Sequence, residues 1–307
     1  MRKKKILITG SSGTIGTGLV ERLLEEDIQF LGVDKRKNEW LLNNLNGSLM
    51  LGDLRDKSTF KQIPEDIDMV IHLAANARVY DLVVSPDLAF ENYEVLFKTL
   101  EFARERGIKR FIFASSREVY GNTKKEILRE DDADIGNCES PYTSSKIGGE
   151  ALVHAYRKCY GIGAVILRFS NVYGRYDKSD RIIPLFIRRC KEGRELVVFG
   201  KEKYLDFTYM DDNISGICLT MDKFDEVDGE VFNIAHGSGT RLTCLAQLII
   251  NQMGRNVGIR IEENRTGEVI KYVADISKAR ERLGYNPRVD IEEGVRKSID
   301  WFNKNVY

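Results

Sequence analysis

The feature that most constrains the fold is a glycine-rich run, KILITGSSGTIG, at residues 5–16. Its apolar start, Ile6–Ile8, predicts a buried strand, and the residues after the last glycine have the periodicity of an amphipathic helix. Gly10 permits a tight turn, Gly13 lets a pyrophosphate approach the backbone, and Gly16 allows the helix to pack closely on the strand. This strand–turn–helix unit predicts a dinucleotide site with its phosphates at the helix N-terminus.

A second strand, expected at Phe30–Val33, is followed by the acidic residue Asp34. A carboxylate at this point accepts the ribose hydroxyls of NAD and repels the 2′-phosphate of NADP. The adjacent Lys35 and Arg36 are able to neutralise such a phosphate, so NADP stays open as the alternative. The alternative to a binding role is a purely structural one, in which the segment is a plain turn with a surface aspartate. The glycine-rich context favours NAD.

Apolar, β-branched runs alternate with helical patterns through the first 170 residues, which is typical of an α/β protein with a Rossmann-like, doubly wound parallel sheet. The expected strands are Ile6–Ile8, Phe30–Val33, Met69–Leu73, Phe111–Ala114 and Ala164–Leu167. The expected helices are Thr14–Glu26, Leu88–Arg106 and Ser145–Tyr160.

After about residue 171 the alternation loosens, and we expect a smaller C-terminal α/β lobe that binds substrate. Its first elements are a helix at Ile182–Lys191, a strand at Leu196–Phe199 and a return strand at Phe207–Tyr209. The predicted division assigns residues 1–170 and 206–235 to the NAD-binding domain, and residues 171–205 and 236–307 to the substrate lobe.

The composition excludes several classes of function. With 307 residues, 42% of them hydrophobic, the chain can bury a substantial core. Its 47 Lys and Arg balance 47 Asp and Glu, so no overall field attracts nucleic acid or a membrane surface. The Lys-rich start at residues 2–5 precedes an apolar run too short for a signal peptide, and we expect a cytoplasmic protein. Five dispersed cysteines and three histidines predict no disulfide framework and no metal site.

The second informative pattern is SPYTSSK, residues 140–146, in which Tyr142 and Lys146 are four residues apart and share one face of a helix. A phenol has a pKa near ~10, so a base that works near neutrality needs it lowered by about three units, or about 4 kcal/mol. A neighbouring ammonium and a positively charged nicotinamide ring both favour the phenolate. Taken alone, the pair would be a surface hydrogen bond.

The strand expected at Phe111–Ala114 ends in Ser115 and Ser116, at the carboxyl edge of the sheet where ligands of such folds bind. A hydroxyl there can orient a substrate or share its proton with Tyr142. Serines at strand ends are commonly structural, so only the combination with Tyr142 and Lys146 makes this position a catalytic candidate.

Together these motifs resemble those of the extended short-chain dehydrogenase/reductases, specifically the NAD-dependent nucleotide-sugar epimerase/dehydratase group. The resemblance runs nearly end to end, through TGSSGTIG, GDLRD, HLAA, SSREVYG, YTSSK, RFSNVYG, DFTYMDD, RTGEV and DISKARERLGY. The cofactor-binding set that follows is Gly10, Gly13, Thr14, Ile15, Gly16, Asp34, Asp53, Leu54, Ala74, Ala75, Asn92, Tyr142 and Lys146.

The resemblance also implies roles at the reacting centre. Tyr142 corresponds to the base, Lys146 also holds the nicotinamide ribose, and Ser116 corresponds to the catalytic hydroxyl. Asn171 matches a contact to the nucleotide sugar. Arg265 matches an arginine on the substrate diphosphate, a group that guanidinium binds in bidentate fashion.

One departure concerns that diphosphate. The family usually has an arginine just before the aspartate of the DFTY segment, where this chain has Leu205. Lys201 or Lys203 is the candidate replacement for the missing charge.

The resemblance implies oxidation of the sugar at C4, and the next step separates the subfamilies. Hexose dehydratases of the usual retaining type carry Asp and Glu at the positions of Arg117 and Glu118. A guanidinium cannot donate a proton near neutral pH, so the general acid for loss of water is missing here. We predict 4-epimerisation of a UDP-hexose, either UDP-glucose and UDP-galactose or the N-acetylated pair. Glu118 as a base at C5 leaves open a 4,6-dehydratase, a decarboxylase or a 5-epimerase, and a salt bridge with Arg117 is its structural interpretation.

Three further expectations complete this interpretation. Tyr272 corresponds to a position beside the sugar C2 substituent, and its bulk favours UDP-glucose and UDP-galactose over N-acetylated sugars. A noncatalytic dinucleotide sensor is the alternative of another class, but such a protein is expected to lack Tyr142 or Lys146. The resemblance also implies a homodimer formed through the helices expected at Leu88–Arg106 and Ser145–Tyr160.

Overall fold

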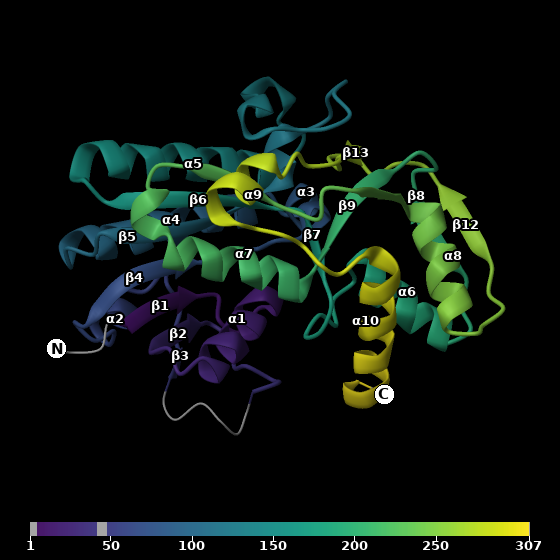
Figure 1. Ribbon diagram of the computed structural model, residues 1–307, viewed down its shortest axis with the longest axis horizontal. Coiled ribbons are helices and arrows are strands. Elements are labelled where there is room, and N and C mark those ends of the chain that lie inside the picture. Colours follow the sequence, from purple (N-terminus) through teal and green to yellow (C-terminus); the bar gives the residue numbers. More distant parts are fainter. Residues whose placement is uncertain (1–4, 42–47, 307) are drawn as a thin grey trace.

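The structure is a computed structural model that describes residues 5–41 and 48–306, so most of the Lys-rich start at residues 2–5 lies outside the described residues. A large sheet with its helices occupies the left of Figure 1, and a second group of strands and helices lies to the right. Across the described ranges, no helix combines the length and the hydropathy needed to cross a bilayer.

Seven parallel strands form the large sheet, in the order β10-β6-β5-β4-β1-β2-β3. They are β1 (Lys5–Thr9), β2 (Phe30–Asp34), β3 (Leu49–Leu51), β4 (Ile67–His72), β5 (Arg110–Ser116), β6 (Gly163–Phe169) and β10 (Val231–Ile234). Ile8 lies opposite Gly32 of β2 on one side and Ile71 of β4 on the other. Because the strand order reverses at β1, the carboxyl ends of β1 and β4 border a crevice. The predicted α/β fold class is confirmed.

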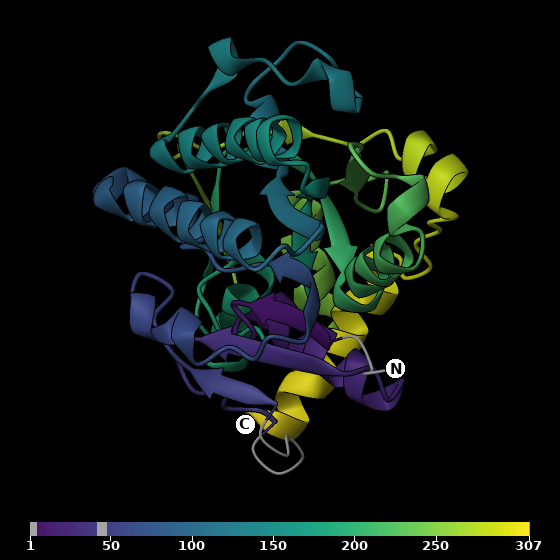
Figure 2. The ribbon, with the colours of Figure 1, turned by 90° about the vertical axis from the view of Figure 1, so that its left-hand side faces the viewer.

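Helices cover both faces of this sheet (Figure 2). One face carries α2 (Lys57–Lys61), α4 (Asp87–Glu105) and α5 (Pro141–Tyr160), which bury Leu7 and Val33 of the sheet against Leu96 and Leu100. The other face carries α1 (Thr14–Glu25) and α7 (Met210–Asp222). A short helix, α3 (Val79–Val84), follows β4 at the crevice. The sheet thus has an apolar core on each side, as continuous apolar strands require.

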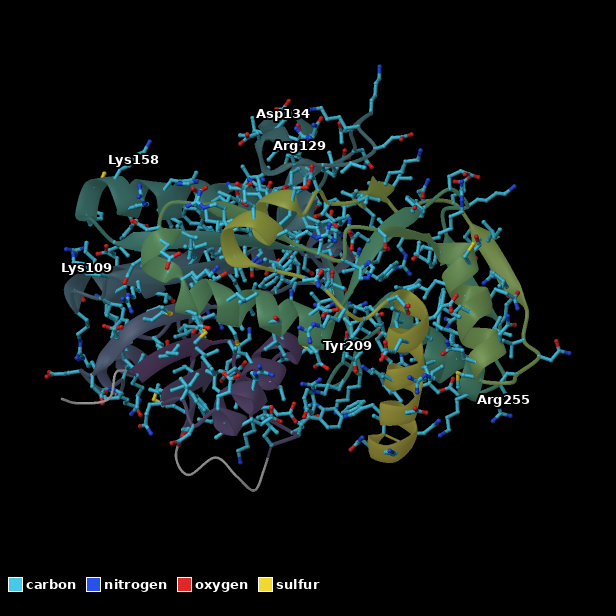
Figure 3. The ribbon with its side chains drawn as sticks, in the orientation of Figure 1. Lys109, Arg129, Asp134, Lys158, Tyr209 and Arg255 are labelled. Atoms are coloured by element: carbon cyan, nitrogen blue, oxygen red, sulfur yellow. The ribbon has the colours of Figure 1, made fainter. Side chains whose placement is uncertain are left out.

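The second group of strands centres on β9 (Tyr204–Tyr209), which pairs with β7 (Asn171–Tyr173), β11 (Gly239–Arg241) and β13 (Lys271–Tyr272). Beside it, β8 (Leu196–Phe199) pairs with β12 (Ile259–Glu262). The helices of this part are α6 (Ile182–Lys191), α8 (Leu242–Gln252), α9 (Ser277–Leu283) and α10 (Ile291–Asn305). The chain returns to the large sheet after Tyr209, which lies between the two parts in Figure 3. The predicted domain boundary at residue 206 therefore falls inside β9, and the division itself stays a prediction.

Short 3₁₀ turns occupy Arg117–Tyr120, Glu130–Asp132, Ile135–Asn137 and Phe224–Glu226. The first three belong to the segment between β5 and α5. Figure 3 shows Arg129 and Asp134 of this segment projecting from the top of the molecule.

One predicted helix start is wrong. The helix expected from Ser145 begins at Pro141, because the Ser140 hydroxyl accepts a hydrogen bond from the Thr143 amide (3.2 Å) and Pro141 occupies the first turn. A serine cap followed by proline is a strong helix start. Tyr142 therefore sits in the first turn of α5, directly at the crevice.

Candidate active site

The carboxyl edge of the large sheet opens into a cleft of about 430 Å³. Eleven of the residues predicted to bind the cofactor line it: Gly10, Gly13, Thr14, Ile15, Gly16, Asp34, Asp53, Leu54, Ala74, Ala75 and Asn92. The structure brings these residues together from five separate stretches of sequence. Their part in binding remains a prediction.

The glycine loop fits the pyrophosphate of a dinucleotide. Gly10 has a positive φ of 72°, and a Cβ there would lie 2.7 Å from the Ala74 amide nitrogen. A Cβ on Gly16 would lie 2.1 Å from the Gly10 carbonyl oxygen. The helix can therefore pack this closely on the loop only because residue 16 is glycine. Gly13 caps α1 without a side-chain hydrogen bond, which leaves the first N–H groups of the helix for an anion.

Asp34 ends β2 at the rim of this cleft and is 8% exposed. Its two carboxylate oxygens accept the backbone N–H groups of Ser12 (3.0 Å) and Arg36 (2.9 Å). The side chain of Arg36 is 72% exposed, with its Nε 3.9 Å from the carboxylate. The carboxylate is thus held in one orientation, as a ribose acceptor requires, while the neighbouring cation extends toward solvent.

Two further predicted residues shape the cleft walls. The Arg55 side chain donates hydrogen bonds to Asp53 and lowers the pKa of that carboxyl to about 2. Asn92 on α4 accepts the Asn76 amide (2.6 Å) and donates to the Asn76 carbonyl oxygen (3.0 Å). Asn92 therefore fixes the loop that follows β4 above the cleft.

A second cavity of about 300 Å³ adjoins the cleft. It is lined by the three predicted catalytic residues and by three of the further predicted substrate contacts: Ser116, Tyr142, Lys146, Glu118, Asn171 and Arg265. The two spaces share a wall that includes Ile15, Ala114 and Phe169. A sugar in the cavity would therefore face a dinucleotide in the cleft.

Tyr142 and Ser116 form the centre of this cavity. Both are buried and line the cavity, and the Ser116 hydroxyl accepts the Glu118 N–H (3.2 Å). Burial raises the pKa of Tyr142, and the neighbouring Ser116 side chain opposes that rise. The net shift of the Tyr142 pKa in the protein alone is therefore upward. The lowering of this pKa expected from the neighbouring lysine does not overcome the effect of burial.

Lys146 lies one turn further along α5. Its Nζ donates a hydrogen bond to the Ala114 carbonyl oxygen (2.8 Å) and is 5.8 Å from the centroid of the Tyr142 ring. Burial lowers the pKa of Lys146 to about 8, and the nearby Glu150 carboxylate opposes this shift. The ammonium is thus tied to the end of β5 beside the phenol.

Arg117 and Glu118 follow Ser116 in a 3₁₀ turn and form a buried ion pair of 2.7 Å. Arg117 also donates from Nε to the Asn171 amide oxygen (3.2 Å). Burial raises the pKa of Glu118, and the charge of Arg117 opposes that rise. The salt bridge named as the structural interpretation of Glu118 is present.

Arg265, Lys201 and Lys203, which were expected near the diphosphate, occupy different environments. Arg265 lines the cavity and stacks on Phe199, with its guanidinium carbon 3.8 Å from the ring centroid. Of the two candidate replacements for the charge missing at Leu205, Lys203 lines the cavity and Lys201 is exposed. Lys203 is buried in an ion pair with Glu268, so its charge is already neutralised.

Tyr272 lies behind the cavity wall, not in it. It is 1% exposed, and its ring stacks on Tyr120 with centroids 5.8 Å apart. The Arg117 guanidinium lies over the Tyr272 ring, 5.8 Å from its centroid. Tyr272 is therefore in contact with Arg117, which does line the cavity.

Sequence reasoning missed two arginines at the shared wall, Arg78 and Arg181, which line both the cleft and the cavity. Neither belongs to a motif, and only the folding of two distant loops brings them together. Among the described residues no cluster of His, Cys, Asp and Glu has the arrangement of a metal site.

Comparison with known proteins shows which family, relatives and solved structures this chain is similar to. The model of the NAD dependent epimerase/dehydratase family matches residues 6–235. A putative UDP-glucose 4-epimerase from Methanocaldococcus jannaschii is 32% identical over 98% of this chain and 99% of its own length. A dTDP-glucose 4,6-dehydratase from an Actinoplanes species is 30% identical over 98% of each chain. The crystal structure of a UDP-glucuronic acid 4-epimerase from Bacillus cereus, in complex with UDP-glucuronic acid and NAD, is 30% identical, covers 99% of this chain and 100% of that chain, and superposes with a TM-score of 0.90.

Proposed function

This chain belongs to the NAD-dependent epimerase/dehydratase family, and from that premise we propose that it interconverts the C4 epimers of a UDP-hexose. Its cofactor is NAD. The substrates proposed are UDP-glucose and UDP-galactose, or the N-acetylated pair. The observation that carries the proposal is the meeting of Tyr142, Ser116 and Lys146 in a cavity that adjoins the cofactor cleft.

Bound NAD supplies a positively charged nicotinamide ring and a reversible hydride acceptor. Tyr142 takes the proton from the sugar C4 hydroxyl and returns it to the ketone oxygen after the sugar has presented its other face. The Ser116 side chain favours the ionised form of the phenol. Lys146 keeps an ammonium beside the ring. Because burial raises the pKa of Tyr142 in the protein alone, the base becomes active only in the loaded site.

Epimerisation is favoured over dehydration by the pair Arg117 and Glu118. Elimination of water needs a general acid next to the C5 base, and Arg117 has no proton to give near neutral pH. Its guanidinium is instead bonded to Glu118 and Asn171. A ketone formed at C4 would then return to the alcohol without loss of water.

A second candidate function uses Glu118 as a base at C5, as a dehydratase, decarboxylase or 5-epimerase would. Glu118 lines the cavity, and its Oε2 has no hydrogen-bond partner within the described part of the chain. Burial also raises the pKa of Glu118 toward the range of a working base. This reaction predicts complete dependence on the carboxylate, whereas 4-epimerisation does not.

The test is incubation of the purified protein, without added NAD, with UDP-galactose, UDP-N-acetylglucosamine, UDP-glucuronate and dTDP-glucose in turn. We expect the C4 epimer of a UDP-hexose as the product on chromatography. Conversion of none of the four would favour the noncatalytic sensor. A 4-keto-6-deoxy sugar or a pentose would contradict the epimerase assignment.

A Glu118→Gln variant separates the two candidates. It keeps a polar partner for Arg117 and removes the base. We expect epimerase turnover to remain within about tenfold of wild type, since only an ion pair is weakened. Loss of all product would assign Glu118 to the chemistry.

The proposal includes a homodimer. One face of α4 presents Phe90, Tyr93 and Phe97, which are 71%, 38% and 43% exposed. Tyr160 at the end of α5 is 49% exposed, and its ring contacts Arg104 in the last turn of α4. Large apolar side chains gathered on two adjacent helices are typical of an interface.

A further inference from the structure

Two arginines have an unusual position between the cofactor cleft and the substrate cavity. Within the described part of the chain, Arg78 and Arg181 are the two charged residues that line both spaces. Arg78 directly precedes α3, and Arg181 is the N-cap of α6. Both side chains are 38% exposed, so they are open to a ligand.

Their guanidinium groups are incompletely bonded. Arg78 Nη1 is 3.5 Å from Asp81 and 3.8 Å from Asp180, and Arg181 Nη1 is 3.5 Å from Asp177. Charge-assisted hydrogen bonds measure about 2.7–2.9 Å, so these contacts are ion pairs without full hydrogen bonds. The Asp177 Oδ2 that faces Arg181 is itself buried and has no hydrogen-bond partner among the described residues. Both arginines retain donors for an anion.

The other cations of the cavity are largely committed. Lys203 is paired with Glu268, and Arg117 is bonded to Glu118. Arg265 is the remaining arginine in the cavity, and it stacks on Phe199. A nucleoside diphosphate carries about two negative charges, and one guanidinium does not neutralise them.

We infer that Arg181, assisted by Arg78, binds the diphosphate of the nucleotide sugar together with Arg265, which lines the same cavity. The inference rests on the proposed function, and it provides the positive charge that Leu205 lacks. The α6 N-terminus strengthens the site, because Ile182 and Ile183 of its first turn also line the cavity and no side chain caps the helix.

The cofactor is a second source of phosphate near these arginines. Its pyrophosphate is already provided for by the uncapped N-terminus of α1 at Gly13. The α6 terminus, by contrast, faces the substrate cavity. We therefore assign Arg181 to the substrate, and the experiment distinguishes the two sources.

The test measures ligand binding to the purified holoenzyme by calorimetry, with UDP, dTDP, the two nucleosides and UDP-glucuronate as probes. In Arg181→Gln we expect the Kd of the bound diphosphate to rise about 10- to 100-fold. The Kd of the nucleoside should stay within about twofold, and the NAD content per chain should be unchanged. Arg181→Lys should recover part of the affinity. Arg189→Gln, on the same helix but outside the cavity lining, is the matched control and should bind as wild type.

Three results would overturn the inference: equal diphosphate affinity in Arg181→Gln and wild type, a loss confined to UDP-glucuronate, or a loss of NAD with diphosphate affinity retained. The second would assign Arg181 to a sugar carboxylate, and the third to the cofactor. Wild-type protein that binds neither UDP nor dTDP would overturn the proposed function as well. If the wild type binds UDP or dTDP and Arg181→Gln binds it equally tightly, this inference alone is overturned.

Discussion

The Lys146 amine donates its hydrogen bond to the Ala114 carbonyl oxygen at 2.8 Å while lying 5.8 Å from the centroid of the Tyr142 ring. The lysine therefore ties the start of α5 to the end of β5, the two elements that carry Tyr142 and Ser116. Ser116 lowers the pKa of the phenol, against the effect of burial. We propose that Lys146 acts on the phenol by fixing this geometry.

Replacing the phenol tests the base directly. We expect Tyr142→Phe to lower turnover by at least about a hundredfold, because the proton of the sugar hydroxyl then has no acceptor. NAD occupancy, measured by its absorbance after release, should be unchanged. Tyr156→Phe is the matched control, since Tyr156 lies on the same helix and its hydroxyl bonds Glu101, away from the cavity. Near-normal turnover in Tyr142→Phe would exclude the role.

The pH dependence of turnover should report Lys146. Burial lowers the pKa of Lys146 to about 8, so its positive charge is present below that pH and lost above it. Initial rates should therefore fall as the pH rises past about 8. Glu150 acts to raise the pKa of Lys146, so Glu150→Gln should move this alkaline limb to lower pH. An alkaline limb that does not move in the variant, with the fold intact by circular dichroism, would contradict the assignment.

The sequence was sufficient where the signal is local. The glycine loop, β2 with Asp34, and α6 at Ile182–Lys191 were predicted because each depends on residues close together in the chain: a turn that only glycine permits, a buried strand, and an amphipathic period. The cofactor NAD followed from the same stretch and is confirmed.

The rest depends on tertiary contacts that no local pattern encodes. Arg78 and Arg181 meet at the shared wall only because the α3 and α6 loops fold over the same crevice. Lys203 was one of two candidates for the charge missing at Leu205, and it is paired with Glu268, which lies 65 positions away in the sequence. Tyr272 was expected beside the sugar and lies behind Arg117, because packing against Tyr120 draws the ring into the core.

Cofactor choice should depend on Asp34. We propose that its carboxylate, held by the Ser12 and Arg36 N–H groups, accepts the ribose hydroxyls of NAD and repels a 2′-phosphate. In Asp34→Asn we expect NAD affinity to fall about tenfold and the preference over NADP to shrink, because the repulsion is lost. Titration of both cofactors into stripped protein measures this. Asp56→Asn, an exposed aspartate that caps α2, should leave both affinities unchanged.

Acid should destabilise the fold through His72. Burial lowers the pKa of His72 to about 3, and its Nδ1 is hydrogen-bonded to the Thr9 hydroxyl (3.0 Å). The unfolded chain takes up the proton below a pKa of about 6.5 while the folded chain does not, so stability is lost as the pH falls through that window. Between pH 7.5 and 5 this costs about 2 kcal/mol of unfolding free energy. Urea titration of His72→Gln should show a smaller loss by about that amount, and an equal loss would contradict the prediction.

The proposed dimer is tested by charge on the apolar face of α4. Phe90 and Phe97 are exposed on the same side of the helix, and packing that face against a second copy would bury them. Placing aspartates there would bury charges without partners, which an interface does not tolerate. We expect wild type to have twice the mass of one chain by light scattering, and the double variant Phe90→Asp, Phe97→Asp to have the mass of one chain. Ile127→Asp, equally polar and placed on the segment between β5 and α5, should leave the dimer intact. A dimer that survives the double variant would place the interface elsewhere.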